Sequence, residues 1–186
     1  MSFRYLPCVL ALAVLTTACS SGDDVQVFGG STDIINHQLT MHDGVITIRV
    51  SGAPNATVDP QGQFTVDGQN VAVNDAQRAL LQRYNATGKK MHDDAIATGK
   101  AGAETATKAL GAVAGKMTGA ESSEETRQKM EAAAEGVRQA AAKICDDMAD
   151  MKSTQDELAT QLDAFKPYGQ ALTDSNIEKC RKSGKH

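Results

Sequence analysis

Between residues 25 and 73, the hydrophobic positions fall into short, largely β-branched runs separated by turn residues. The runs are Val25–Phe28, Ile34–Met41, Val45–Val50, Ala56–Val58, Phe64–Val66 and Val71–Val73. Asp43-Gly44, Asp59–Gly62 and Asp67-Gly68 stand between runs, and an Asp-Gly pair in such a place is a strong hairpin signal. The pattern predicts an antiparallel β-meander over residues 25–73, with one apolar face that another element must cover.

The pattern changes at Asn74, beyond which helix-forming residues dominate. Asn74 with Gln77 three positions later is a variant of the capping box, in which two residues satisfy free amide groups at a helix start. These residues predict a helix from Asp75 to about Thr118. Its expected seam consists mostly of small residues, which let a second helix approach closely: Leu81, Tyr84, Gly88, Met91, Ala95, Thr98, Gly102, Thr105, Ala109 and Ala112.

A second capping box, Ser122 with Glu125, precedes the clearest periodicity in the chain. Seam positions then recur alternately four and three residues apart, and only Gln155 among them is polar: Met130, Ala134, Val137, Ala141, Ile144, Met148, Met151, Gln155, Leu158, Leu162 and Phe165. This spacing is typical of a long helix packed in coiled-coil fashion. It predicts a helix from Ser123 to Phe165, about 65 Å long by the rise per residue.

The two helices are expected to run antiparallel because only a short turn near Gly119 joins them. Pro167 disfavours helix at the residue before it and is expected to end the second helix, and Thr173 can cap a short helix to about Lys182. The predicted fold class is α+β. An N-terminal antiparallel β-meander (25–73) is followed by a long antiparallel helical hairpin (74–165), then by a short C-terminal helix and a disordered tail (166–186).

Residues 1–18 have the features of an export signal: a basic start at Arg4, a short apolar run, and small residues before a cut site. The apolar run is too short to span a bilayer, which takes about 20 apolar residues. The segment Leu15-Thr16-Thr17-Ala18-Cys19 resembles a lipobox, so we expect Cys19 to be acylated and to begin the mature chain, with a tether over residues 19–24. The alternative is an ordinary signal peptide cut nearby, with Cys19 a plain thiol.

The residues after Cys19 bear on location. Ser20 and Ser21 resemble those of lipoproteins sorted to the outer membrane, whereas Asp at the first position retains enterobacterial lipoproteins at the inner membrane. Two or more acyl chains, such as palmitate, anchor a protein stably. We therefore expect a lipoprotein held to the outer membrane through Cys19, facing the periplasm.

Cys145 and Cys180 remain once Cys8 leaves with the leader and Cys19 carries lipid. Because an exported chain folds in an oxidising compartment, we predict a disulfide between Cys145 and Cys180. The alternatives are two free thiols, or a metal pair that lacks its other ligands. The cross-link would stabilise the fold by roughly 3–4 kcal/mol in the chain-entropy model.

No pattern of catalytic, cofactor-binding or metal-binding residues occurs in the chain. Nucleophile-elbow, Walker A and zinc-protease motifs are absent. His37 and His42 are expected on opposite faces of one strand, and the clusters His92-Asp93-Asp94 and Cys145-Asp146-Asp147 diverge around their helices, so we interpret the clusters as solvated helix faces. A net charge of -4 without a basic patch offers nucleic acid no electrostatic footprint. We therefore expect a non-enzymatic protein without metal or cofactor.

The segment 95–119 is unusually rich in Gly and Ala, with glycines at 99, 102, 111, 115 and 119. One interpretation is close packing against Ala132, Ala133 and Ala134 within the hairpin. The other is a segment that self-associates or binds a membrane surface or a small hydrophobic ligand, because small residues four apart favour close contact in membranes.

The run ATVDPQGQFTVDGQNVAVNDAQRALLQRY, residues Ala56 to Tyr84, resembles the YggN-like family of proteobacterial envelope proteins. In that family a meander ends in an Asp-Gly…Asn-x-Ala-Gln-Arg stretch that opens long helices, and a late-helix cysteine such as Cys145 fits the pattern. The resemblance implies an exported protein with no assigned activity, and it transfers no site residues.

Together these features lead to two expectations of function. The first is a non-enzymatic envelope lipoprotein, a protein-interaction or structural module that binds another envelope protein or self-associates. The second is membrane-surface or small-hydrophobe binding through the Gly/Ala-rich helix 95–119.

Overall fold

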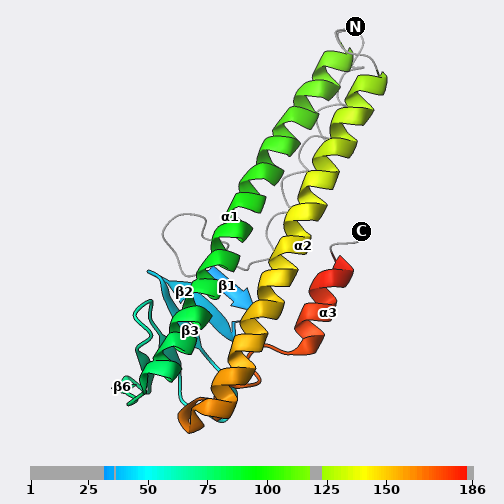
Figure 1. Cartoon of the computed structure of the whole chain (residues 1–186). Helices are drawn as coiled ribbons and strands as arrows, with labels where there is room; N and C mark the ends of the chain where they lie inside the picture. Colours follow the sequence, from blue (N-terminus) through cyan, green and yellow to red (C-terminus); the bar gives the residue numbers. More distant parts are fainter. Residues whose placement is uncertain (1–31, 36, 118–122, 184–186) are drawn as a thin grey trace, which may run out of the picture.

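The computed structural model describes residues 32–35, 37–117 and 123–183. The fold class is the predicted one, α+β, with an antiparallel sheet followed by two long helices and a short C-terminal helix (Figure 1). Several expectations lie outside the described residues: the signal peptide 1–18, the tether 19–24 with acylation of Cys19, the strand Val25–Phe28, the turn near Gly119, the cap at Ser122, and the tail after Ser183.

Over the described residues the sheet has six strands in chain order, and each pairs antiparallel with the next. The strands are β1 (Thr32–Ile35), β2 (Leu39–His42), β3 (Val45–Ile48), β4 (Ala56–Val58), β5 (Phe64–Val66) and β6 (Gln69–Asn70). The turns at Asp43-Gly44 and Asp67-Gly68 are confirmed. Both residues of each pair have positive φ, as a two-residue hairpin turn of type I′ requires.

Two strand predictions are wrong. The run Ile34–Met41 is not one strand, because His37 takes a left-handed backbone (φ 60) and β1 turns back to pair with β2. His37 therefore does not share a strand with His42. The last strand is Gln69–Asn70 rather than Val71–Val73, because only the Val71 amide bonds back to β5, at Phe64 O (2.9 Å), before the chain leaves for the first helix.

Helix α1 (Asp75–Met117) begins at the predicted capping box. The Gln77 amide donates to Asn74 Oδ1 (2.9 Å), and the Asn74 amide donates to Gln77 Oε1 (3.0 Å). The same Gln77 side chain donates through Nε2 to Gln161 O (2.7 Å), the last residue of α2 (Ser123–Gln161). One residue thus caps the start of α1 and fixes the end of α2 beside it.

The predicted end of the second helix at Phe165 is wrong by four residues. Leu162 has an extended backbone (φ -129, ψ 103), and a 3-10 helix, η1 (Asp163–Tyr168), follows with Pro167 inside it. Phe165 is still buried in the core, because η1 lies at the lower end of α2 (Figure 1) and the centroid of the Phe165 ring is 5.3 Å from that of Phe64 on β5. The last helix, α3 (Asp174–Ser183), starts after Thr173 as expected, and Thr173 Oγ1 accepts a hydrogen bond from the Asn176 amide (3.3 Å).

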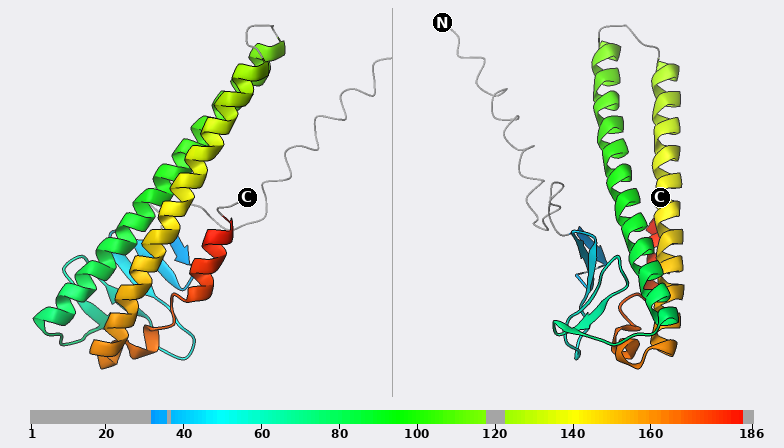
Figure 2. Two further views of the ribbon diagram at one scale, coloured as in Figure 1. Left: turned by 45° about the vertical axis from the view of Figure 1, so that its right-hand side comes forward. Right: turned by 60° about the vertical axis from the view of Figure 1, so that its left-hand side comes forward.

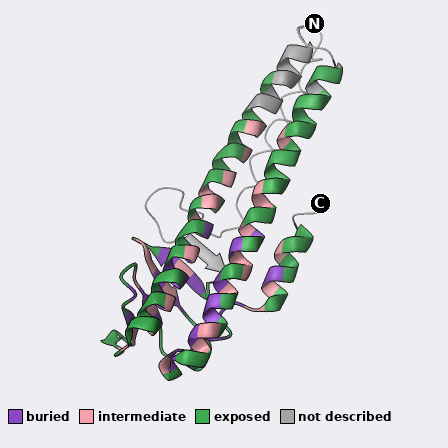
Figure 3. Cartoon of the chain, viewed as in Figure 1, coloured by how far each residue is buried: buried purple, intermediate pink, exposed green. Residues whose placement is uncertain are grey.

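The core lies between the sheet and the adjoining halves of α1 and α2 (Figure 3). Its centre is a group of four aromatic rings with centroids 5.3–5.9 Å apart: Phe64, Tyr84, Phe165 and Tyr168. At Gly88, α1 packs closely against the sheet, because a Cβ there would be 2.6 Å from Ile46 Cδ1. Asn85 is buried on α1 and donates to Gly44 O (2.8 Å) and Val58 O (2.9 Å), which ties the helix to the β2–β3 turn and to the end of β4.

Beyond the core, α1 and α2 continue side by side as a projecting pair (Figure 2). We call residues 92–117 of α1 and 123–144 of α2 the arm, and the rest of the described structure the base. No arm residue with a described side chain is buried, whereas Met91 and Cys145 at its root are. The core therefore stops at the root of the arm.

The predicted seam holds at most of the described arm positions of α1 but fails in the outer part of α2. The half-buried predicted positions are Thr98, Gly102 and Thr105 of α1 and Ala141 and Ile144 of α2. Ala95, Ala134 and Val137 are exposed, and Ala133 and Ala140 are half-buried on the outer part of α2 instead. A stripe with a strict seven-residue repeat drifts by about 20° per heptad around a straight α-helix. Without supercoiling, the predicted stripe on α2 therefore rotates away from α1 toward the tip.

Candidate functional site

The three histidines that the structure describes lie apart from one another. His37 is exposed in the turn between β1 and β2, His42 is exposed at the end of β2, and His92 lies beside Asp93 on the arm. Among the described residues, no group of three or more His, Cys, Asp or Glu side chains is placed to hold a metal ion.

Four charged side chains meet between the helices at the root of the arm. Lys90 of α1 pairs with Asp147 of α2, and Lys143 of α2 lies 2.9 Å from the Asp94 carboxylate of α1. Lys90 also lies 3.5 Å from Asp94. The side chain of Asp147 is only 6% exposed, so interpreting this residue as part of a solvated face was wrong.

We call Lys90, Asp94, Lys143 and Asp147 the ion cluster. Their hydrogen bonds shift the pKa values of two of its members. The hydrogen bond from Lys143 holds the pKa of Asp94 below its ordinary value, and the hydrogen bond with Asp147 raises the pKa of Lys90. Sequence reasoning missed the cluster, although a signal was present. Lys90 and Asp94, and likewise Lys143 and Asp147, are four residues apart and so lie on one face of each helix.

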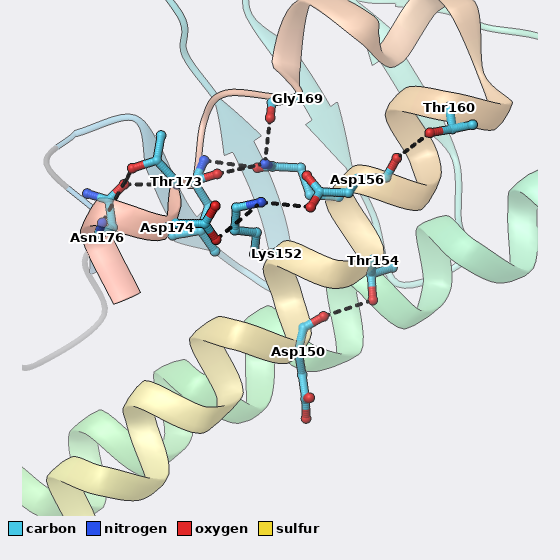
Figure 4. Close-up of polar contacts among 11 residues, drawn as sticks. Asp150, Lys152, Thr154, Asp156, Thr160, Gly169, Thr173, Asp174 and Asn176 are labelled. Carbon is cyan, nitrogen blue, oxygen red and sulfur yellow. Dashed lines mark hydrogen bonds and ion pairs between the residues drawn. The ribbon is translucent and has the colours of Figure 1, made fainter. Parts of the chain in front are cut away.

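The C-terminal segment is fastened to α2 beside the ion cluster. Cys145 and Cys180, the predicted pair, are joined in the structure by a disulfide with an S–S distance of 2.02 Å. Gln155, fully buried, donates to Gly169 O (2.9 Å) and to Leu172 O (2.9 Å), and accepts from the Leu172 amide (3.0 Å). Figure 4 shows the bond that reaches Gly169.

An open groove runs between α2 and α3, lined by charges of both signs. Lys152 in it lies 2.7 Å from Asp156 and 3.6 Å from Asp174 (Figure 4). Lys182 pairs with Glu178 (2.7 Å), and Arg181 lies 3.5 Å from Asp146. These cations are neutralised by neighbours within the chain, so the groove offers no concentrated charge to a ligand.

The described glycines of the arm are not closely packed within the hairpin, contrary to one of the two interpretations of segment 95–119. A Cβ built at Gly99, Gly102 or Gly111 would meet no atom within 4 Å. The close packing against Ala132, Ala133 and Ala134 is therefore absent at these described positions. Close packing requires a glycine instead in the base, at Gly88 of α1 and at Gly62 in the turn before β5, where a Cβ would be 2.6 Å from Ile46 Cδ1 and from Arg78 O respectively.

The exposed apolar surface of the arm lies on α2. Met130 is 52% and Val137 37% exposed, and Ala134 between them is also exposed. Around them, Arg127 lies 2.6 Å from both Glu124 and Glu131, and Arg138 lies 2.9 Å from Glu135. An apolar strip bordered by ion pairs is the described feature best suited to contact another macromolecule.

Comparisons with known proteins place the chain in a family. A family model described as "Protein of unknown function (DUF2884)" matches residues 34–127, just over half of the 186 residues. The chain belongs to this family. The matched segment contains β2 to β6 and all of α1, and stops before Met130 and the disulfide. Neither the curated proteins nor the solved structures yielded a match.

No helix among the described residues is long and apolar enough to cross a membrane.

Proposed function

We propose that this protein is a non-enzymatic lipoprotein of the cell envelope, anchored by lipid on Cys19 to the outer membrane, facing the periplasm. Its base is a folded support, and its arm is a protein-interaction module. Within the DUF2884 family, we assign it to the YggN-like proteins of proteobacterial envelopes, on the resemblance over Ala56 to Tyr84.

One observation carries the proposed role of the arm: none of its described side chains is buried. Most helical stability in proteins comes from packing of an apolar face rather than from helix propensity. Four glycines with open space around their Cα positions, Gly99, Gly102, Gly111 and Gly136, weaken these helices further, at about 1 kcal/mol each relative to Ala. An arm of this kind gains stability when a partner covers its apolar strip.

The proposed location is supported by the leader. Residues 1–18 have an export pattern, and the lipobox-like segment ends at Cys19, followed by Ser20 and Ser21. Acylation can be tested by labelling cells with a palmitate analogue. We expect the label on the natural chain and its loss in Cys19→Ser. A natural chain that stays unlabelled while it is exported would contradict the anchor.

The interaction role can be tested by site-specific photo-crosslinking in intact envelopes. A crosslinking amino acid at Val137 should yield discrete protein adducts, whereas one at Asp43, an 88% exposed residue on a turn of the base, should not. Because Asp43 is more exposed than Val137, simple accessibility predicts the reverse order. Adducts at 137 no stronger than those at 43 would contradict a binding role for the arm.

A second candidate function is binding of a membrane surface or a small hydrophobic ligand through the Gly/Ala-rich helix 95–119. The observation that favours it is the open space around Gly99, Gly102 and Gly111, which the hairpin itself leaves unfilled. Liposome flotation of the unlipidated Cys19→Ser chain tests it. If this second candidate is right, the protein should float together with the vesicles. A protein that floats with neither neutral nor anionic vesicles would contradict it.

A further inference from the structure

The exposed strip on α2 has a regular internal order. We define the arm stripe as Met130, Ala134, Val137 and Ala141, spaced by four, three and four residues so that all lie on one side of the helix. Met130, Ala134 and Val137 are exposed, and Ala141 is half-buried. Large and small side chains alternate along the stripe.

The arm stripe continues a face of α2 that is already an interface. Ala141, Cys145 and Ala149 are four residues apart and therefore share a face. Cys145 is bonded to α3, and Ala149 lines the groove beneath α3. Helix α3 extends only along the lower part of α2 (Figure 1), so the same face runs on beyond it toward the arm stripe.

We propose that the arm stripe binds a second copy of itself, with the two α2 helices antiparallel about a two-fold axis between residues 135 and 136. In that register Met130 lies against the partner's Ala141, and Ala134 against the partner's Val137. The pair then contains four layers, and in each layer one large side chain, Met130 or Val137, faces an alanine of the other copy. Facing positions that alternate large and small side chains interdigitate without voids.

The charges beside the arm stripe fit the same arrangement. Glu131 and Arg138 each follow a stripe residue directly and lie on one flank. Within the chain, Glu131 pairs with Arg127 and Arg138 pairs with Glu135. In the antiparallel pair, Glu131 also lies near the partner's Arg138, and the two-fold axis produces this additional contact twice. Opposite charges across an interface fix register more than they add affinity.

A parallel pair would be less complementary. Met130 would face the partner's Met130, and Ala134 would face the partner's Ala134, so layers of two large side chains would alternate with layers of two small ones. Cavities at the alanine layers cost stability, since a packed interior loses contacts around every void. The arrangement of sizes therefore selects the antiparallel orientation.

This inference rests on the proposed interaction role of the arm, and names the partner as a second copy. Sedimentation velocity of the full Cys19→Ser chain tests it, with a concentration-dependent shift from monomer to dimer expected. Val137→Glu should abolish the dimer, because it places a carboxylate in two of the four layers. The matched control, Ala142→Glu, puts the same charge at an exposed position on the outer side of the helix and should leave the dimer intact.

Two further variants test the register. Arg138→Glu should weaken dimerisation, and adding Glu131→Arg to it should restore dimerisation by exchanging the charges. In oxidised mixtures, chains with Ala134→Cys and chains with Val137→Cys should cross-link to each other more readily than either chain to itself. Preferential self-linking of each would overturn the antiparallel register.

Circular dichroism of Val137→Glu checks that the exposed substitution leaves the fold in place. A natural chain that stays monomeric at the highest concentration reached, or a dimer that survives Val137→Glu, overturns the inference. The photo-crosslinker at position 137 separates the two proposals. Adducts to a different protein leave the interaction role standing and refute self-pairing, whereas adducts to lipid alone or no adducts refute both.

Discussion

The Gln155 side chain and the Leu172 backbone form two reciprocal hydrogen bonds, Nε2 to the Leu172 carbonyl (2.9 Å) and the Leu172 amide to Oε1 (3.0 Å). A third bond joins the Gln155 Nε2 to Gly169 O (2.9 Å). Gln155 is the single polar residue in the predicted seam of α2, and these hydrogen bonds explain why a polar side chain is buried there. Its amide holds the chain between η1 and α3 against α2.

Replacing Gln155 by Leu should therefore destabilise the protein, although Leu fits the seam pattern better. The substitution leaves buried backbone groups at Gly169 and Leu172 without partners, at about 1–3 kcal/mol for each unsatisfied group. We expect a loss of about 3 kcal/mol in the free energy of unfolding, measured in urea. The control is Gln170→Leu, at an exposed position, and equal effects of the two changes would refute this role.

Two glycines of α1 should respond in opposite directions to alanine. At Gly88 a Cβ would lie 2.6 Å from Ile46 Cδ1, so Gly88→Ala should destabilise the fold by about 1–3 kcal/mol through overpacking. At Gly102 a Cβ meets no atom within 4 Å, so Gly102→Ala should stabilise the helix by up to about 1 kcal/mol. Thermal unfolding of both variants measures this, and a destabilised Gly102→Ala would show that the arm is more tightly packed than described.

The two buried tyrosines differ in whether their hydroxyl group forms a hydrogen bond, so their Phe variants can be compared. Tyr168 Oη donates to Pro54 O (2.9 Å), so Tyr168→Phe should cost about 1 kcal/mol. Tyr84 Oη is buried without a hydrogen-bond partner among the described residues, and burial raises its pKa above the ordinary value. Tyr84→Phe should therefore cost nothing and can gain up to about 1 kcal/mol. A larger loss for Tyr84→Phe in urea unfolding would reveal a partner for that hydroxyl.

The ion cluster at the root of the arm predicts an acid-dependent stability. The folded pKa of Asp94 lies below its ordinary value of 3.8, chiefly because Lys143 donates a hydrogen bond to it. A carboxyl whose pKa falls on folding stabilises the fold above the unfolded pKa, and this contribution is lost as pH drops through the folded pKa. Stability should therefore fall as the solution is acidified below 3.8.

Urea unfolding of the natural chain and of Asp94→Asn over this range measures that contribution. Asp94→Asn should flatten the acid dependence and be less stable at neutral pH. The control is Asp150→Asn, an exposed carboxylate of α2 outside the cluster. If the free energy of unfolding of the natural chain and of Asp94→Asn depended on pH identically, the ion cluster would contribute nothing to stability.

Local signals predicted much of the base. Asp43-Gly44 and Asp67-Gly68 specify hairpin turns through their own backbone preferences, and Asn74 with Gln77 specifies a helix start through side-chain bonds three residues apart. These features depend on neighbours in sequence. They needed no knowledge of the tertiary fold.

The errors arose where tertiary contacts or helix geometry decide. The end of α2 depends on a contact from Gln77 to Gln161, 84 positions apart, which the rule about Pro167 could not foresee. The exposure of Val137 follows from the drift of a seven-residue stripe around a straight helix. The pairing of Lys90 with Asp147 needed the register between two helices, which neither helix specifies alone.

Amide hydrogen exchange of the full Cys19→Ser chain at low and high concentration tests the account most directly. We predict that, in dilute solution, amides of the arm exchange much faster than those of the base around Tyr84 and Leu158, because no described arm side chain is buried. At high concentration, protection should rise along residues 127–141 and stay constant in the base. An arm as strongly protected as the base in dilute solution would contradict the claim that the arm needs a partner.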